Sequence, residues 1–92
     1  MDIYSKIEEH DNQEVKINIY AIICQLEKKE FNNYTLSLQE ARSSFKLEII
    51  EPVYQINQEK LVIHNELLFS LKVIIKERRI FSLACEKIED LP

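Results

Sequence analysis

Apolar side chains occupy every second position from Leu67 to Ile75, and serine or lysine stands at several of the positions between them. This alternation has the period of a β-strand, in which successive side chains point to opposite faces of a sheet. A second alternation runs from Phe81 to Cys85, after a charged segment at residues 77–79. We therefore predict that residues 61–88 form one long antiparallel hairpin.

The first third of the chain contains two different patterns. Apolar residues alternate with polar ones from Val15 to Ile23, which predicts a strand over residues 15–27. Before it, Ile3 and Ile7 stand four positions apart in a polar segment. That spacing places them on one side of a helix, so a short helix or ordered arm is expected over residues 2–10.

The middle of the chain fits two kinds of element. Two short runs alternate like strands: Tyr34, Leu36 and Leu38, then Phe45, Leu47 and Ile49. The same stretch fits a helix, because Ser37 to Glu40 has the form of a capping box, and the apolar residues that follow would share one helical face ending near Pro52. The sequence leaves both strand and helix open for residues 38–50.

Glycine is absent from all 92 residues, where average usage predicts about six. Phosphate-binding loops, dinucleotide-binding loops and nucleophile elbows depend on glycine, so none can form here in its usual shape. Tight turns must instead use residues that tolerate a positive φ. The candidates are Asp11-Asn12, Asn32-Asn33 and Asn57.

These patterns predict an α+β fold. We expect a single domain over residues 1–92, dominated by an antiparallel β-sheet and carrying a short N-terminal helix, with an all-β fold as the alternative. A chain of this length is within the size of one domain with one core.

Composition narrows the classes of partner. The net charge is −4 and the basic residues form no extended cluster, which disfavours direct binding to nucleic acid. The longest apolar run, Ile19–Cys24, is far shorter than the roughly 20 residues that cross a bilayer. The N-terminus lacks the apolar stretch of a signal peptide, so a cytoplasmic location is the expectation.

Residues that could carry chemistry do not form a recognisable motif. His64 begins an H-x-E sequence without the P-C-x-x-C that accompanies it in zinc deaminases, and His10 lies in a polar run. Cys24 and Cys85 lack a metal-ligand spacing and each stands in an apolar stretch, which favours two reduced structural thiols over a disulfide.

Two carboxylate pairs, Glu8-Glu9 and Glu89-Asp90, fall near the chain ends among other charges, which is typical of a solvated surface. Ser43-Ser44 has no placed histidine, and without glycine no oxyanion turn of the usual form is available. We therefore expect neither an enzyme nor a protein with a cofactor or metal.

The opposite faces of the expected strands carry a second apolar set, which includes Ile22, Cys24 and Leu26 with Leu68, Ile74 and Ile80. A sheet that is apolar on both faces must be covered twice. The second cover is either the chain's own N-terminal segment and residues 38–50, or another molecule. In the latter case Ile22, Leu68, Ile74 and Ile80 are the expected partner-binding residues, and a homo-oligomer is the simplest form.

The main functional hypothesis is a non-catalytic intracellular protein-binding or adaptor protein that self-associates through this apolar face. One alternative is a small acidic inhibitor or immunity protein, phage-encoded in one version, that blocks a nuclease or toxin. The Ile-, Lys-, Glu- and Asn-rich composition fits a low-GC genome. The run Ile80-Phe81-Ser82-Leu83 after a long strand resembles SecB-like export chaperones, which implies a second alternative, the binding of unfolded chains.

Overall fold

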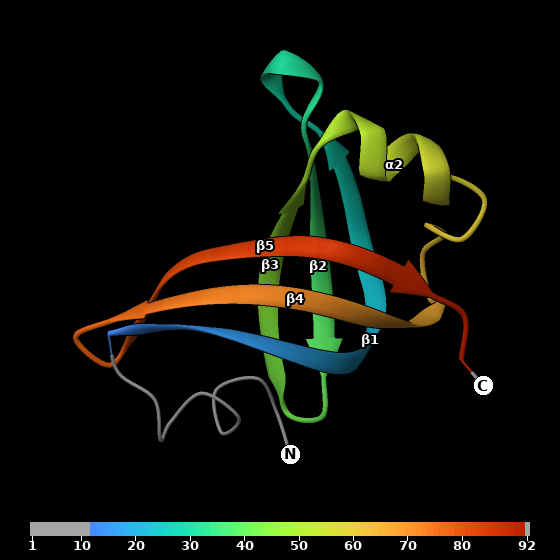
Figure 1. Cartoon of the computed structure of the whole chain (residues 1–92). Helices are drawn as coiled ribbons and strands as arrows, with labels where there is room; N and C mark the ends of the chain where they lie inside the picture. Colours follow the sequence, from blue (N-terminus) through green and yellow to red (C-terminus); the bar gives the residue numbers. More distant parts are fainter. Residues whose placement is uncertain (1–11, 92) are drawn as a thin grey trace.

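The computed structural model of the chain describes residues 12–91. Five strands form one antiparallel sheet in the order β3-β2-β1-β4-β5. This sheet curls into a half-barrel, so that β3 at one end of the order lies near β5 at the other (Figure 1). The elements in chain order are β1 (Gln13–Lys28), the 3-10 turn η1 (Glu30–Asn32), β2 (Tyr34–Glu40), β3 (Ser43–Ile49), α2 (Glu51–Asn57), β4 (Glu66–Lys76) and β5 (Arg79–Glu89).

Strand β1 produces the curl because it belongs to both halves of the sheet. Its residues 13–22 pair with β4, while residues 22–28 pair with β2. The register with β2 shifts between Ile23 and Gln25, which leaves Cys24 as an extra residue. Such a bulge bends a strand and increases its twist. Figure 1 shows β1 turning from the layer of β4 and β5 into the layer of β2 and β3.

The core lies on the inner side of this curl. The predicted strand over residues 15–27 is confirmed, and so is the alternation from Leu67 to Ile75, whose odd positions are all buried. The predicted hairpin also forms, except that residues 61–65 precede it as a loop. The largest fully buried side chains are Phe69, Ile19, Ile23, Leu36, Leu38, Leu47, Ile49, Leu67, Leu71, Ile75 and Val73.

The ambiguous middle segment is a hairpin rather than a helix. Leu36 of β2 stands directly opposite Leu47 of β3, and both side chains are fully buried. A helix would scatter these residues around its axis, whereas paired strands place them on the inner face. The connecting turn contains Ala41 and Arg42, and Ala41 has a φ of 51°.

The prediction of an α+β fold with a short N-terminal helix is wrong. The described α-helix, α2, lies between β3 and β4, and the five strands make the fold close to the all-β alternative. Pro52, which we expected to end a helix, lies in the first turn of this one, where its missing N–H has no helical partner to lose. The segment 2–10 lies outside the described residues. Within residues 12–91, no helix has the length and apolar character needed to cross a membrane.

Helix α2 is fixed to the sheet by aromatic stacking. The rings of Tyr34 and Tyr54 are 3.7 Å apart between centroids and inclined by 6°. Burial, together with a hydrogen bond to the Glu51 carboxylate, raises the pKa of the Tyr34 phenol. At the other end of the helix, the Asn57 side-chain amide donates to the Val53 carbonyl over 2.8 Å. The start of α2 is therefore anchored to β2.

The turns form without glycine by placing other residues in the left-handed region. The described residues with positive φ are Asn12, Phe31, Asn32, Ala41, His64, Glu77 and Arg78. Two of the predicted turn residues, Asn12 and Asn32, are among them. Asn33 and Asn57 are not, since Asn33 has a φ of −95° and Asn57 ends α2. Asp11 lies outside the described residues.

Candidate protein-binding surface

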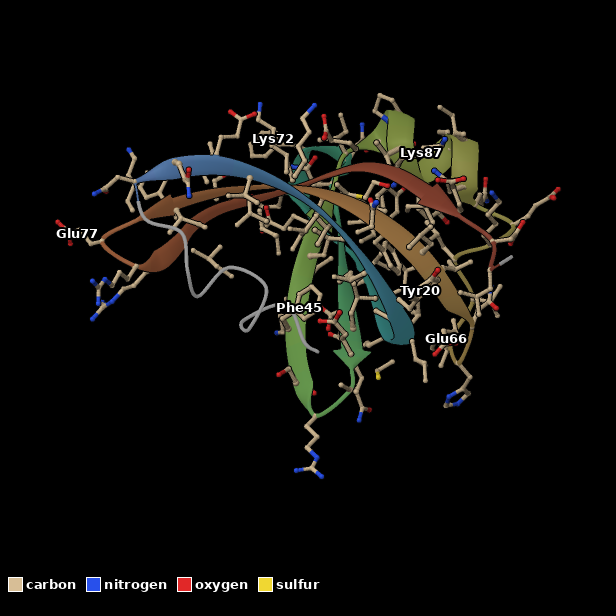
Figure 2. All side chains as sticks on the ribbon, turned by 60° about the horizontal axis from the view of Figure 1, so that its bottom comes forward. Tyr20, Phe45, Glu66, Lys72, Glu77 and Lys87 are labelled. Atoms are coloured by element: carbon tan, nitrogen blue, oxygen red, sulfur yellow. The ribbon has the colours of Figure 1, made fainter. Side chains whose placement is uncertain are left out.

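The outer, convex face of the sheet carries an apolar group where β1 meets the start of β4. Tyr20 stands opposite Leu68 in the register, and Ile22 stands opposite Glu66. Tyr20 is 51% exposed, Ile22 is 37% exposed and Leu68 is half-buried. Figure 2 labels Tyr20 and Glu66 at the same end of the sheet. We call Tyr20, Ile22 and Leu68 the outer patch.

Polar residues border the outer patch. Ile22 has Glu66 on one neighbouring strand and Gln39 on the other, and both of these side chains are exposed. A central apolar region inside a polar rim is the usual composition of a protein–protein interface, and tyrosine is enriched in such regions.

A charged band crosses the middle of the outer face. Lys16 and Lys72 stand directly opposite each other, and a carboxylate lies near each ammonium group. The Lys16 Nζ is 3.8 Å from the Glu86 Oε1, and the Lys72 Nζ is 3.7 Å from the Glu14 Oε1. This band separates the outer patch from Ile74, which lies beyond it on β4 opposite Glu14 and Ser82. The outer face is thus apolar at one end rather than along its length.

Ile80 lies apart from the three other residues predicted to bind a partner. The register between β4 and β5 shifts between Ile74 and Ile75, so that Ile80 is paired with Ile75. Ile80 consequently packs against the buried core. The structure brings Ile22 and Leu68 to one end of the outer face, places Ile74 on the same face beyond the charged band, and turns Ile80 inward. The role of all four in partner binding stays a prediction.

The sequence analysis did not include Tyr20, Val62 or Ile63 among the expected partner-binding residues. The Asn65 carbonyl accepts a hydrogen bond from the Ile23 amide over 3.0 Å, and the His64 amide donates to the Ile23 carbonyl over 2.7 Å. These bonds hold the loop before β4 beside the bend of β1, and Val62 and Ile63 are exposed on that loop. The sequence signal that could have indicated Tyr20 was its aromatic ring at an outward position of an alternating strand.

A second exposed aromatic side chain lies near the tip of the β4–β5 hairpin. Phe81 is 66% exposed, and the Lys76 Nζ is 4.1 Å from the centroid of its ring. The ammonium group interacts with the face of the ring, an attraction of about 0.5–1 kcal/mol at an exposed position. Within residues 12–91, the ring of Phe81 thus has a cation as a partner, whereas the ring of Tyr20 contacts neither a cation nor another ring.

The residues with potential for chemistry remain dispersed. Both cysteines are free thiols; Cys24 is exposed at the β1 bulge and Cys85 is half-buried, where burial raises its pKa to about 11. Among residues 12–91, no three His, Cys, Asp or Glu side chains are close enough together to hold a metal ion. His64 is exposed on its loop, whereas His10 and Glu8-Glu9 lie outside the described residues. Glu89 and Asp90 form separate surface ion pairs with Lys87 and Lys60.

The two thiols should react with alkylating reagents at different rates. The nucleophile is the thiolate, and a pKa of about 11 leaves only about one in a thousand Cys85 side chains ionised at about pH 8. We expect iodoacetamide to modify Cys24 in the folded protein well before Cys85, as measured by peptide mass spectrometry. A Cys24→Ser variant should lack the fast phase, and equal labelling of both thiols in the native protein would contradict the placement of Cys85.

The fold and surface define a domain with one curled antiparallel sheet and an apolar patch on its convex face. No protein-family model matches the chain, and no solved structure matches it. The chain is similar to Shootin-1 of Pongo abelii, with 32% identity over 81 residues that cover 77% of this chain and 18% of that protein. Shootin-1 of Homo sapiens is 32% identical over 77% of this chain and 13% of its own length, and that of Mus musculus is 31% identical over the same shares.

This chain therefore spans less than a fifth of the Shootin-1 proteins that it matches. The likeness concerns a segment of those proteins, and a similarity of sequence over a segment does not carry the activity of the whole protein.

Proposed function

We propose that the chain is a non-catalytic protein-binding or adaptor protein that self-associates through the outer patch and acts without a cofactor. The observation that carries the proposal is the exposure of Tyr20 and Ile22 beside Leu68 on the convex face. Removing apolar surface from water stabilises an association by roughly 25 cal/mol per Å². A second copy presenting the same three side chains would bury all of them at once.

Two further features support the proposal. A symmetric dimer uses the same surface on both copies, so a residue on the symmetry axis meets its own copy, and an uncharged centre avoids repulsion between like charges there. The outer patch meets this condition, because the lysines of the charged band lie further along β1 and β4 and each is near a carboxylate. The partial likeness to Shootin-1 is compatible with a protein-binding role.

Ile22→Asp should abolish self-association and leave the fold intact. Association would require burial of the new carboxylate without a partner, whereas in the monomer this partly exposed position leaves the carboxylate in water. Sedimentation velocity over a range of concentrations measures the change.

Ile50→Asp makes the same substitution at an exposed position between β3 and α2, away from the outer patch, and is expected to sediment like the wild type. A wild-type protein that stays monomeric at the highest concentrations, or equal behaviour of the two variants, would contradict self-association through this face.

A further inference from the structure

The tip of the β4–β5 hairpin carries positive charge. Strand β4 ends with Lys76, the turn contains Glu77 and Arg78, and β5 begins with Arg79; all four side chains are exposed. Three cations and one carboxylate give these four residues a formal charge of +2, in a chain whose net charge is −4. Figure 2 shows Glu77 at the opposite end of the hairpin from Lys87. We call residues 76–79 the basic tip.

Carboxylates of the described residues do not neutralise this charge. Lys76 and Arg79 stand directly opposite each other in the register, and within residues 12–91 neither of them forms an ion pair. The Glu14 carboxylate, on the neighbouring strand, is already 3.7 Å from the Lys72 Nζ. Like charges that face each other across two strands oppose folding. The basic tip therefore contributes a local charge and no stability to the sheet.

A β-bulge exposes an aromatic ring beside the basic tip. The register between β4 and β5 shifts between Ile74 and Ile75, which leaves Phe81 as an extra residue of β5. A bulge changes the direction of a side chain at this kind of position. The ring of Phe81 is largely exposed, and the Lys76 Nζ lies over it. Apolar and cationic groups thus reach the surface together at this end of the hairpin.

The turn of the basic tip has an unfavourable backbone conformation for its residues. Glu77 has a φ of 53° and Arg78 a φ of 62°, in the region where glycine, asparagine and aspartate are preferred. The Asn12 Oδ1 accepts a hydrogen bond from the Glu77 amide over 3.3 Å, which connects the turn to the residue before β1. Such local strain is concentrated at functional sites, so the tip has the features of a binding element.

The shape and charge of the tip favour a flat anionic surface as its partner. Proteins bind single-stranded nucleic acid in grooves and small ligands in concave pockets, whereas this site is the convex end of a hairpin (Figure 1). An anionic bilayer attracts basic side chains to its surface. It also accepts apolar rings at the boundary between headgroups and acyl chains, where lysine can extend its ammonium group to the headgroups.

We propose that the basic tip and Phe81 bind the surface of an anionic lipid bilayer. The ring of Phe81 enters the headgroup boundary, while Lys76 and Arg79 contact lipid phosphates. The acidic remainder of the chain interferes little at about 0.1 M salt, because exposed charges more than about 10 Å apart are screened and the chain is 35 Å long in its largest dimension. This site is separate from the outer patch and does not depend on self-association.

The β1–β2 hairpin provides an internal comparison. Its turn residue Phe31 is 90% exposed, but the charges beside it are balanced. Lys28 and Lys29 are accompanied by Glu27 and Glu30, and the Lys29 Nζ is 2.7 Å from the Glu27 Oε2. This hairpin presents an aromatic ring without net positive charge, so it should not bind an anionic bilayer.

The experiment is co-sedimentation of the full chain with lipid vesicles at about 0.1 M salt. We expect binding to vesicles of phosphatidylcholine with phosphatidylserine, no binding to pure phosphatidylcholine, and weaker binding as salt is added. Each basic residue near such a surface contributes about fivefold to binding. Arg79→Glu, which changes the charge by two, should therefore weaken binding by about 25-fold, and Phe81→Ala should weaken it by about tenfold.

Lys28→Glu and Phe31→Ala are the matched controls, because they make the same kinds of change at exposed positions of the β1–β2 hairpin. Both should bind vesicles like the wild type, and all four variants should keep the circular dichroism spectrum of the wild type. Absence of wild-type binding, equal binding to both kinds of vesicle, or equal losses in test and control variants would each overturn the proposal. Tighter binding to a single-stranded oligothymidylate than to vesicles, measured by anisotropy, would assign the tip to nucleic acid instead.

Discussion

Val73→Glu should unfold the protein. Val73 is fully buried and stands between Val15 of β1 and Leu83 of β5. A glutamate there would place a carboxyl group in the apolar interior without a partner, at a cost of several kcal/mol. A small domain has a total stability of about 5–15 kcal/mol. Circular dichroism and urea denaturation should show loss of most or all of the folded state.

Ile74→Glu is the matched comparison, because the next residue of the strand points to the outer face. Its neighbours there are Glu14 and Ser82, and its side chain is only half-buried. The carboxylate can remain in contact with water, so we expect a folded protein that is destabilised by about 1 kcal/mol. If Ile74→Glu unfolds as readily as Val73→Glu, the outer face is covered within the chain.

Phe69→Ala should be the most damaging of the truncations in the core. Phe69 is fully buried and pairs with Ile19 on one side and Ile88 on the other, so it lies where three strands contribute to the core. Replacing a buried phenylalanine by alanine costs about 3–5 kcal/mol, from lost burial and from the cavity that remains.

Phe81→Ala removes the same side chain from the adjacent strand at an exposed position, where Lys76 is its contact. We expect a cost of about 1 kcal/mol or less. Urea denaturation of both variants measures the two free energies of unfolding, and similar losses would contradict the placement of Phe69 at the centre of the core.

The sequence correctly predicted the strands that have one buried face and one more exposed face. The odd positions from Leu67 to Ile75 face the core, and a one-residue shift of register would expose all of them, so the alternation is strict. Between residues 34 and 49, helical and strand periods fit equally well over short runs. The choice depends on the pairing of Leu36 with Leu47, a tertiary contact that the local pattern does not contain.

The errors have specific causes. Pro52 is compatible with the start of a helix as well as with a stop, and we considered only the stop, so α2 was missed. The fold class was wrong because we assigned the helix to the N-terminal segment, whereas the described helix lies between β3 and β4 in a chain dominated by strands. The register shift near Ile74 turns Ile80 toward the core, although simple alternation places it on the outer face. A bulge leaves little trace in an apolar pattern, because both faces carry isoleucine here.

The candidate sites could be predicted only as far as local alternation reaches, because tertiary contacts are not contained in it. Ile22 and Leu68 were assigned to the outer face from alternation alone, and the structure places them there. A groove between α2 and the end of β5 joins a helix that was not predicted to a strand about 30 residues later in the chain. Its existence depends on tertiary packing, so no spacing of residues in the sequence indicates it.

Because β1 belongs to both halves of the sheet, its two parts can pair only one after the other while the chain is being synthesised. Strands β1, β2 and β3 follow one another, and each can pair with the next soon after it is synthesised. The first ten residues of β1 cannot pair so early, because their partner is β4. Almost 50 residues separate Tyr20 of β1 from Leu68, its partner on β4. Closing this loop costs more chain entropy than closing the β1–β2 or β2–β3 hairpin. Until β4 is synthesised, a chain still attached to the ribosome carries the first part of β1 as an unpaired apolar strand.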